Sequence, residues 1–258
     1  MFVSSLRLTR AYFYANIERA LEYGTSFAGE VCSMLINDVM WLTFWVAFFD
    51  RFPVADGWGR AEVVTLWAVV ATGFGLATTV FGNAMRLAGI IARGELDVFL
   101  TRPVPVLLHV LVSRMSFVAW GDVIFGVGAF TLLVRPSPTD GVLFAVLAVS
   151  DAALFVGFAV VAGSLAFWLH GAEGIAGSAV QLLITFSTYP TSIFRGALRV
   201  VLFTILPAGV LAFVPIKVLA GHEWRWLALH IAVSTLFVVL GAQIFARGLR
   251  RYESGNHG

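Results

Sequence analysis

Residues 63–82 read VVTLWAVVATGFGLATTVFG, a stretch that contains no Asp, Glu, Lys or Arg. As an α-helix it would be about 30 Å long, at about 1.5 Å per residue, which matches the thickness of the hydrocarbon core of a bilayer. Three further stretches, 152–169, 174–194 and 226–246, also lack these four residue types. The sequence therefore predicts an α-helical membrane protein with at least four spans.

The composition of the chain agrees with that prediction. Of its 258 residues, 59% are hydrophobic and 12% are charged, whereas soluble domains contain about 45–50% apolar and about 25% charged residues. The net charge is +2, and the cations, 16 Arg and Lys217, are scattered between apolar segments. This scattering argues against nucleic-acid binding, which uses a basic stripe. Cys32 is the single cysteine, so an intrachain disulfide and a cysteine-based metal cluster are excluded.

Apolar segments and the turn residues between them predict six transmembrane helices. These spans cover residues 31–49, 61–83, 110–134, 142–169, 174–194 and 226–246. Residues 1–30 come before them and contain an amphipathic helix, 5–24, that we expect to lie at the cytoplasmic membrane surface. The expected organisation is this interfacial segment, a six-span membrane domain at 31–246 and a cytoplasmic tail at 247–258.

An uncharged segment at 200–216 is predicted not to cross the membrane. Pro207 splits it and Pro215 is expected to end it, because proline has no N–H to donate and disturbs a helix interior. We expect two half-helices that enter the membrane and return, forming a re-entrant hairpin between spans five and six. Irregular backbone at this depth is tolerated where other helices bury it.

The distribution of arginine predicts that both termini are cytoplasmic. With the N-terminus inside, the inner segments 1–30, 85–114 and 247–258 carry three, four and three arginines, as the positive-inside rule requires. The outer segment 195–225 carries four cations and departs from the rule. No signal peptide is recognisable near the N-terminus. We expect a multi-pass protein of the bacterial cytoplasmic (inner) membrane.

The connection between spans two and three reads MRLAGIIARGELDVFLTRPVP, at 85–105. Leu87, Ile90 and Ile91 recur at helical spacing, which predicts a short amphipathic helix with this face on lipid and two arginines on another face. Gly94 is expected to stop that helix. Two prolines further on would prevent helix formation until the third span.

No nucleotide-binding P-loop is visible in the sequence. That motif places Lys after a glycine-rich turn, whereas the single lysine, Lys217, follows V-P-I. We therefore expect no enzymatic activity and no cofactor in this chain. The histidines are not at mutual metal-ligand spacing, so we expect no metal site either. If the protein transports its substrate against a concentration gradient, the energy must come from ATP hydrolysis by another chain or from an ion gradient.

Three aspartates, Asp38, Asp122 and Asp151, fall inside predicted spans. An ionised carboxylate there costs several kcal/mol unless it is paired or hydrated. These residues could line a substrate path or a proton relay. They could equally form structural ion pairs between helices, for example Asp122 with Arg114. The residues alone leave both interpretations open.

Four stretches of the sequence resemble permeases of the ABC-2 superfamily. They are GELDVFLTRPVP (94–105), YPTSIFRGALR (189–199), LPAGVLAFVP (206–215) and RYESG (251–255). The resemblance extends in order over essentially the whole chain. It implies a six-span permease subunit of an ATP-binding cassette exporter that forms the substrate pathway. Two copies of a separate ATPase, which would bind ATP and Mg, and a second permease, identical or homologous, are the implied partners.

The same resemblance implies roles for particular residues. The loop between spans two and three would touch the ATPase, and re-entrant helices would form an outer gate. The implied coupling residues are Arg86, Arg93, Gly94, Glu95, Leu96, Asp97, Arg102 and Pro103. The implied gate residues are Pro190, Pro207 and Pro215. The family does not fix a substrate.

Two other classes of function are open to a chain of this composition. An ion-coupled secondary transporter could use the intramembrane aspartates, although the internal repeat typical of such carriers is not visible between the two halves. A membrane-embedded enzyme would need several His, Asp or Ser residues that converge at one depth. The scattered acids of this sequence do not show that pattern.

Overall fold

The computed structural model describes residues 2–22, 24–52 and 57–252, with side chains from Arg7 onward. Every regular element among them is helical. The longer helices are α1 (Phe2–Glu22), α2 (Gly24–Arg51), α3 (Arg60–Phe81), α7 (Trp120–Ala129), α8 (Pro138–Ser164), α9 (Ala172–Ser187), α11 (Ala208–Gly221) and α12 (Trp224–Leu249). The shorter helices are α4 (Leu87–Ala92), α5 (Asp97–Leu100), α6 (Val106–Val112) and α10 (Gly196–Thr204). Further turns are η1 (Gly82–Arg86), η2 (Phe117–Ala119), η3 (Phe130–Val134), η4 (Leu165–Phe167) and η5 (Thr191–Ile193).

The prediction of a multi-pass helical membrane protein is confirmed at the level of helices. Among the described residues, five segments are long and apolar enough to cross a membrane, namely Gly24–Arg51, Arg60–Ala92, Phe117–Val134, Pro138–Phe167 and Trp224–Leu249. α10 and α11 form a pair bent by 81°, and counting this pair as one span gives six. α9 occupies the place of the predicted fifth span, but its 16 residues are only about 24 Å long. The six-span count, the surface position of α1 and the re-entrant hairpin remain predictions.

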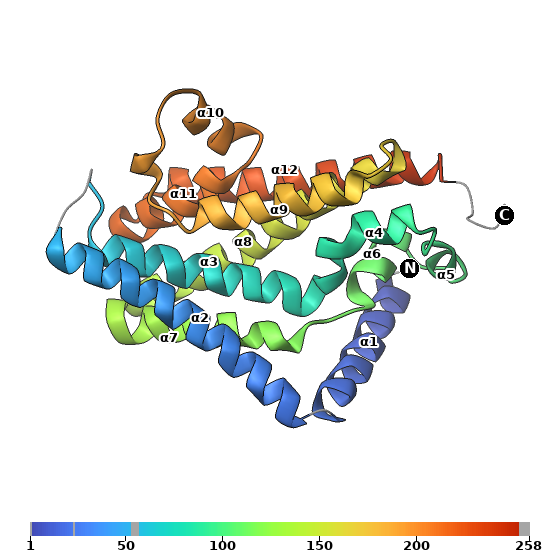
Figure 1. Ribbon diagram of the computed structural model, residues 1–258, viewed down its shortest axis with the longest axis horizontal. Coiled ribbons are helices and arrows are strands. Elements are labelled where there is room, and N and C mark those ends of the chain that lie inside the picture. The colour runs from blue at the N-terminus through green and yellow to red at the C-terminus, as the bar shows by residue number, and fades with distance from the viewer. Residues whose placement is uncertain (1, 23, 53–56, 253–258) are drawn as a thin grey trace.

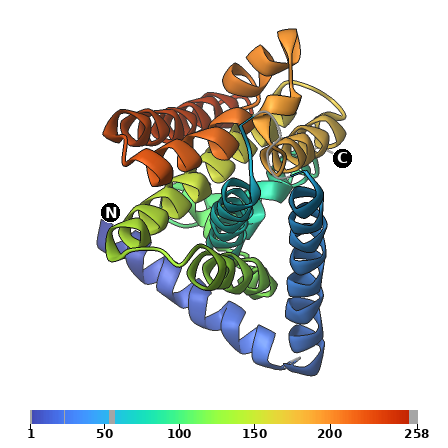
Figure 2. The same ribbon diagram turned by 90° about the vertical axis from the view of Figure 1, so that its left-hand side faces the viewer.

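Helix α3 lies in the middle of the bundle (Figures 1 and 2) and is buried along most of its length. A side chain at Gly73 would collide with Cβ of Asp151 on α8, and one at Gly75 would collide with the side chain of Val123 on α7. Small residues of this kind let helix backbones approach closely, which is how helices associate in lipid. The position of α3 therefore depends on its glycines.

Helices α8 and α12 run side by side in the same direction (Figure 1). Gly157 of α8 faces the backbone of α12 at Phe237. Earlier in both helices, the hydroxyl of Ser150 donates to the hydroxyl of Ser234 at 3.1 Å. The pair thus combines close backbone approach with a hydrogen bond between buried side chains.

The third span is broken, contrary to the prediction of one helix over 110–134. α6 ends, and after four intervening residues a new helical stretch begins with η2 and continues through α7 and η3. The side-chain amide of Asn83 donates to the carbonyl oxygen of Val110 at 3.0 Å, and the backbone amide of Ser116 donates to the carbonyl oxygen of Thr78 at 3.3 Å. The break is tolerated because neighbouring residues supply these partners for the backbone on either side of it.

The two prolines of the 200–216 segment behave differently. Pro207 lies in the bend, directly before α11, where its missing N–H is not needed by the helix. Pro215 was expected to end the helix, but it lies inside α11. Proline there cannot donate to the carbonyl oxygen of Leu211, yet the helix continues to Gly221. Pro215 is buried, so packing against neighbouring helices holds α11 through this position.

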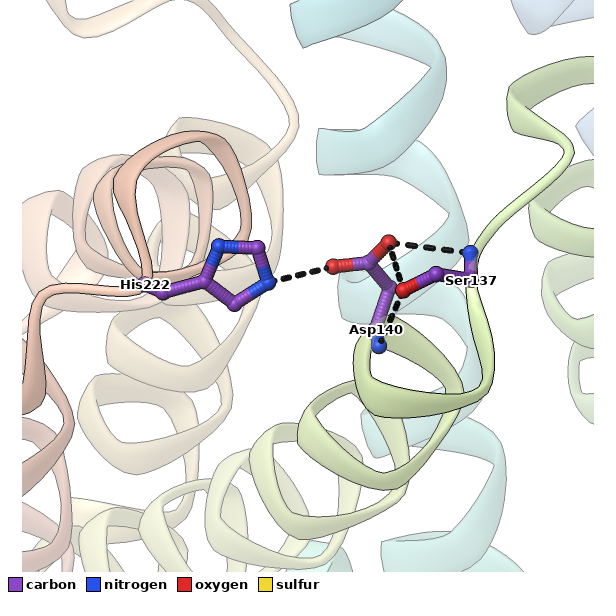
Figure 3. A network of polar contacts seen from close by, with 3 residues as sticks. All are labelled: Ser137, Asp140 and His222. Atoms are coloured by element: carbon purple, nitrogen blue, oxygen red, sulfur yellow. Dashed lines mark hydrogen bonds and ion pairs between the residues drawn. The ribbon is translucent and has the colours of Figure 1, made fainter.

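The turn before α8 is joined to the end of α11. The Asp140 carboxylate accepts hydrogen bonds from the backbone amide and the hydroxyl of Ser137 at 2.9 and 2.7 Å. The Asp140 amide donates back to the Ser137 hydroxyl at 3.2 Å, which completes a capping box. Figure 3 shows the other Asp140 oxygen pointing to Nε2 of His222, 2.9 Å away. This network joins two helix ends at the side of the molecule opposite to the termini (Figure 1).

The packing of α7 against α3 gives a testable prediction. In Gly126→Ala, the new methyl group would press on the carbonyl oxygen of Ala68 and the side chain of Thr72. Overpacking of this kind costs about 1–3 kcal/mol, which outweighs the roughly 1 kcal/mol that Ala gains over Gly in a helix. We expect a lower midpoint of thermal unfolding in detergent, measured by circular dichroism.

Gly128 on the same helix is the matched control, because an added Cβ there would have no heavy atom of the described residues within 4 Å beyond its chain neighbours and its own helix backbone. Gly128→Ala should unfold at the wild-type temperature or slightly above it. Equal midpoints for the two variants would contradict the close contact between α3 and α7.

Candidate functional site

The segment that contains the expected coupling residues begins with a helix stop at Gly94. Gly94 has a φ of +72°, a left-handed conformation that glycine adopts without steric cost. Its amide donates to the carbonyl oxygen of Ile91 at 3.1 Å, and the amide of Glu95 donates to that of Ile90 at 3.0 Å. These bonds satisfy the last carbonyls of α4, as in a helix C-cap. The predicted helix stop is present.

The apolar face of α4 is buried in protein, so the prediction that it rests on lipid is wrong. Leu87, Ile90 and Ile91 are 0%, 3% and 5% exposed, and α4 packs against α8 and α9. Leu96, just after the stop, is also fully buried. Periodicity cannot distinguish the two environments, because lipid and protein interiors both favour apolar side chains. α4 is therefore anchored in the helix bundle.

Arg93 links this segment to α9. Its Nε lies 2.6 Å from Oε1 of Glu95, and its Nη1 lies 3.3 Å from Oε1 of Glu173. The hydrogen bond from the guanidinium lowers the pKa of the Glu95 carboxyl, so Glu95 is ionised at neutral pH. The three side chains are about half exposed, and exposed pairs contribute little stability. Arg86 is exposed as well.

The residues after Leu96 form an exposed turn built on α5. Val98 and Leu100 are 69% and 45% exposed, and Arg102 and Pro103 are also exposed. Apolar side chains grouped at the surface and rimmed by polar ones are a feature of protein contact surfaces. We call residues 97–103 the α5 turn. Its composition suits contact with another protein.

Two contacts hold the α5 turn to the rest of the molecule. Asp97 lies beside Tyr252, and burial together with the hydrogen bond and negative charge of Asp97 raises the pKa of the Tyr252 hydroxyl. On the other side, Nδ1 of His109 lies 3.2 Å from the carbonyl oxygen of Phe99, and its Nε2 lies 2.9 Å from the hydroxyl of Tyr12. A neutral ring protonated on Nδ1 donates to Phe99 and accepts from Tyr12. His109 of α6 thus joins α5 to α1.

These features lie at one end of the molecule. Figure 1 shows the start of α1, the segment from α4 to α6 and the end of α12 together at the right-hand side. A hollow of about 490 Å³ at this end is bounded by Arg93, Phe167 and Tyr252, among other residues. Three separate parts of the chain therefore meet around the α5 turn.

Deeper in the bundle, Asp38 of α2 and Asp122 of α7 lie side by side. They are 8% and 5% exposed, and their carboxyl groups are close enough to share a hydrogen bond. Both line a cavity of about 300 Å³ that also involves α3 and α9. The suggested pairing of Asp122 with Arg114 is wrong. The break before α7 places Asp122 in the first turn of that helix, where its neighbour is a carboxyl group.

Asp151 lies outside this cavity, on α8. Its Oδ1 is 2.8 Å from Nε2 of His230 on α12, and neither side chain is exposed. Asp151 therefore faces a histidine of the neighbouring helix and not the cavity.

The three gate prolines, Pro190, Pro207 and Pro215, are all buried. Pro190 precedes η5, which packs against α11. Thus the segment after α9 contacts α11, which contains Pro215 and directly follows Pro207. Among the described residues, no group of three or more His, Cys, Asp or Glu side chains could hold a metal ion.

A family model described as ABC-2 family transporter protein matches residues 35–256. None of the curated proteins or solved structures compared with the chain matches it. The matched region contains both aspartates of the cavity, the α5 turn and α12. It also contains the resembling stretch 251–255, of which the part after Tyr252 lies outside the described residues. The chain therefore belongs to the ABC-2 family of transporter proteins.

Proposed function

We propose that this chain is the permease subunit of an ATP-driven exporter, with two copies of a separate ATPase as its motor. Membership of the ABC-2 family supports a permease that works with an ATPase. The observation that carries the proposal is the exposed α5 turn, anchored between α1, α6 and the end of α12 (Figure 1). ATP and Mg would bind to the ATPase.

The anchoring of the α5 turn suits the transmission of motion. A force applied to the turn would be transmitted to α8 and α9 through the buried face of α4. It would reach α1 through the hydrogen bonds of His109 with Phe99 and Tyr12. A contact that couples hydrolysis to transport needs such stiff connections, because a loose loop would absorb the movement.

A second permease, identical or homologous, would complete the transporter. Most of α2 is exposed, including the apolar side chains of Ile36 and Met40 at 68% and 58%. This face is available to lipid or to the second permease. The Asp38 and Asp122 cavity beside it would form part of the substrate path.

An ion-coupled carrier is the alternative that uses the same carboxyl groups. Membership of the ABC-2 family favours the ATP-driven mechanism over it. Under that mechanism the carboxyl groups bind substrate and do not move protons.

We further propose that the end carrying the α5 turn faces the cytoplasm of a bacterial cell, with both termini on that side. Cysteine labelling tests this orientation in a Cys32→Ser background, because the native cysteine is exposed. Val98→Cys and Arg251→Cys should react with a membrane-impermeant maleimide only after the inner membrane is opened, whereas Phe52→Cys should react in intact cells. Labelling of Arg251→Cys from outside would contradict the proposed orientation.

The coupling contact predicts a loss of ATPase affinity when the α5 turn is altered. In Val98→Ser/Leu100→Ser, two exposed apolar side chains that would be buried by the ATPase are removed. Burying a side chain of this size contributes about 1.5–3 kcal/mol, so the Kd for the ATPase should rise at least about tenfold. Binding is measured by biolayer interferometry on nanodiscs, with a purified ABC ATPase from the same organism as the partner.

Phe52→Ser is the matched control, because Phe52 is 54% exposed and lies at the opposite end of the molecule. This variant should bind the ATPase with the wild-type Kd. If Val98→Ser/Leu100→Ser bound the ATPase with the wild-type Kd, the α5 turn would not be part of the coupling contact.

A further inference from the structure

The cavity between α2, α3, α7 and α9 has the size and position of a ligand site. Its volume is about 300 Å³, at the lower end of the roughly 300–1,000 Å³ typical of small-molecule pockets. Asp38 lies midway along α2, so the cavity is far from both membrane surfaces. The α5 turn lies at one end of the molecule (Figure 1), so a ligand bound midway along α2 would not compete with an ATPase bound there.

The cavity contains two carboxyl groups without a matching cation. With one proton shared between them, the Asp38 and Asp122 carboxyl groups carry one negative charge, and a bound cation would favour this state over the doubly protonated, neutral pair. Apart from that pairing, Oδ2 of Asp38 is buried with no partner, and Oδ1 has only the Asn37 amide at 3.5 Å. No Arg, Lys or His is among the described residues that line the cavity. A buried charge of this kind favours a ligand that supplies the positive charge.

The remaining walls suit an organic cation better than a metal ion. Trp41 and Trp67 stack with ring centroids 6.4 Å apart, and both line the cavity. Indole rings attract ammonium groups through cation–π interactions, whereas hard metal ions require six or more oxygen ligands. Trp67 is 7% exposed and its indole N–H has no acceptor. An oxygen atom of the ligand that reached this N–H would satisfy it.

From these observations we propose that the cavity binds a lipophilic ammonium compound, an organic cation with an apolar body and an oxygen acceptor. The carboxyl pair holds the ammonium group, the indole rings contact the apolar body, and the Trp67 N–H donates to the oxygen. This inference rests on the proposed permease function and names the chemical class of its substrate.

A pair of nearly identical probes tests the role of charge. Choline phenyl ether has a quaternary ammonium group, an ether oxygen and an aromatic ring, and its neutral isostere is 3,3-dimethylbutyl phenyl ether. Binding is measured by equilibrium dialysis against the chain in nanodiscs, with protein-free nanodiscs subtracted. We expect the cation to bind at least about tenfold more tightly than the neutral ether.

Substitutions then assign that preference to the cavity. Asp38→Asn/Asp122→Asn preserves size and hydrogen bonding and should abolish the preference for the cation, without changing binding of the neutral ether. Trp41→Leu should weaken cation binding about threefold to thirtyfold. The matched control is Asp151→Asn, which changes a buried carboxyl outside the cavity and should keep the wild-type preference.

Several results would overturn the proposal. They are equal wild-type affinities for the two ethers, an unchanged preference in the double variant, or a preference lost in the Asp151→Asn control. The assay contains no ATPase, so its outcome is separate from that of the coupling experiment. If the chain binds the ATPase but does not prefer the cation, only the proposed substrate class is contradicted. If it prefers the cation but does not bind the ATPase, only the proposed exporter function is contradicted.

Discussion

The close approach of α7 and α8 to α3 is the contact on which the rest of the structure depends. Water is absent between helices in a bilayer, so apolar side chains alone give little drive for association. Glycines at the crossings, Gly73 and Gly75 on α3 and Gly126 on α7, bring the backbones together instead. That packing positions Asp122 on one side of α3 and Asp151 on another. The carboxyl cavity and the buried Asp151–His230 pair both follow from it.

The broken third span connects the two candidate sites. α6 carries His109, which contacts the α5 turn, whereas α7 carries Asp122, which lines the membrane cavity. Only four residues separate α6 from η2, and Asn83 and Ser116 hold that break to α3 and the turn after it. A displacement of the α5 turn therefore has a short path to the cavity. In the proposed exporter, this path would couple ATP hydrolysis to release of the substrate.

The sequence predicts the features that lipid or local geometry imposes. Long uncharged stretches must form helices in a bilayer. Apart from a closed barrel, only a helix lets a membrane-spanning segment pair all its backbone N–H and C=O groups there. Gly94 was identifiable as a stop because a left-handed residue after a helix favours glycine. The bend at Pro207 was predictable for a similarly local reason. Pro215 was not, because tertiary packing keeps α11 intact there.

Contacts between distant parts of the chain could not be predicted in this way. The pairing of Asp38 with Asp122 depends on how α2 packs against α7, which no local pattern records. The contact of His109 with Tyr12 joins residues 97 positions apart, and its one visible signal was a histidine inside the apolar run VLLHVLV. The break after α6 depends on partners supplied by Asn83 and Thr78. Hydropathy does not register such partners, so the third span looked continuous.

The most direct test of the central claim is to identify what touches the α5 turn in the native membrane. p-Benzoylphenylalanine is placed at Val98 and, as a control, at Phe52, and the cross-linked proteins are identified by mass spectrometry after irradiation of living cells. We predict that a P-loop ATPase is cross-linked at Val98 and not at Phe52. Cross-linking of the ATPase at Phe52 alone, or its absence from both positions, would contradict this account.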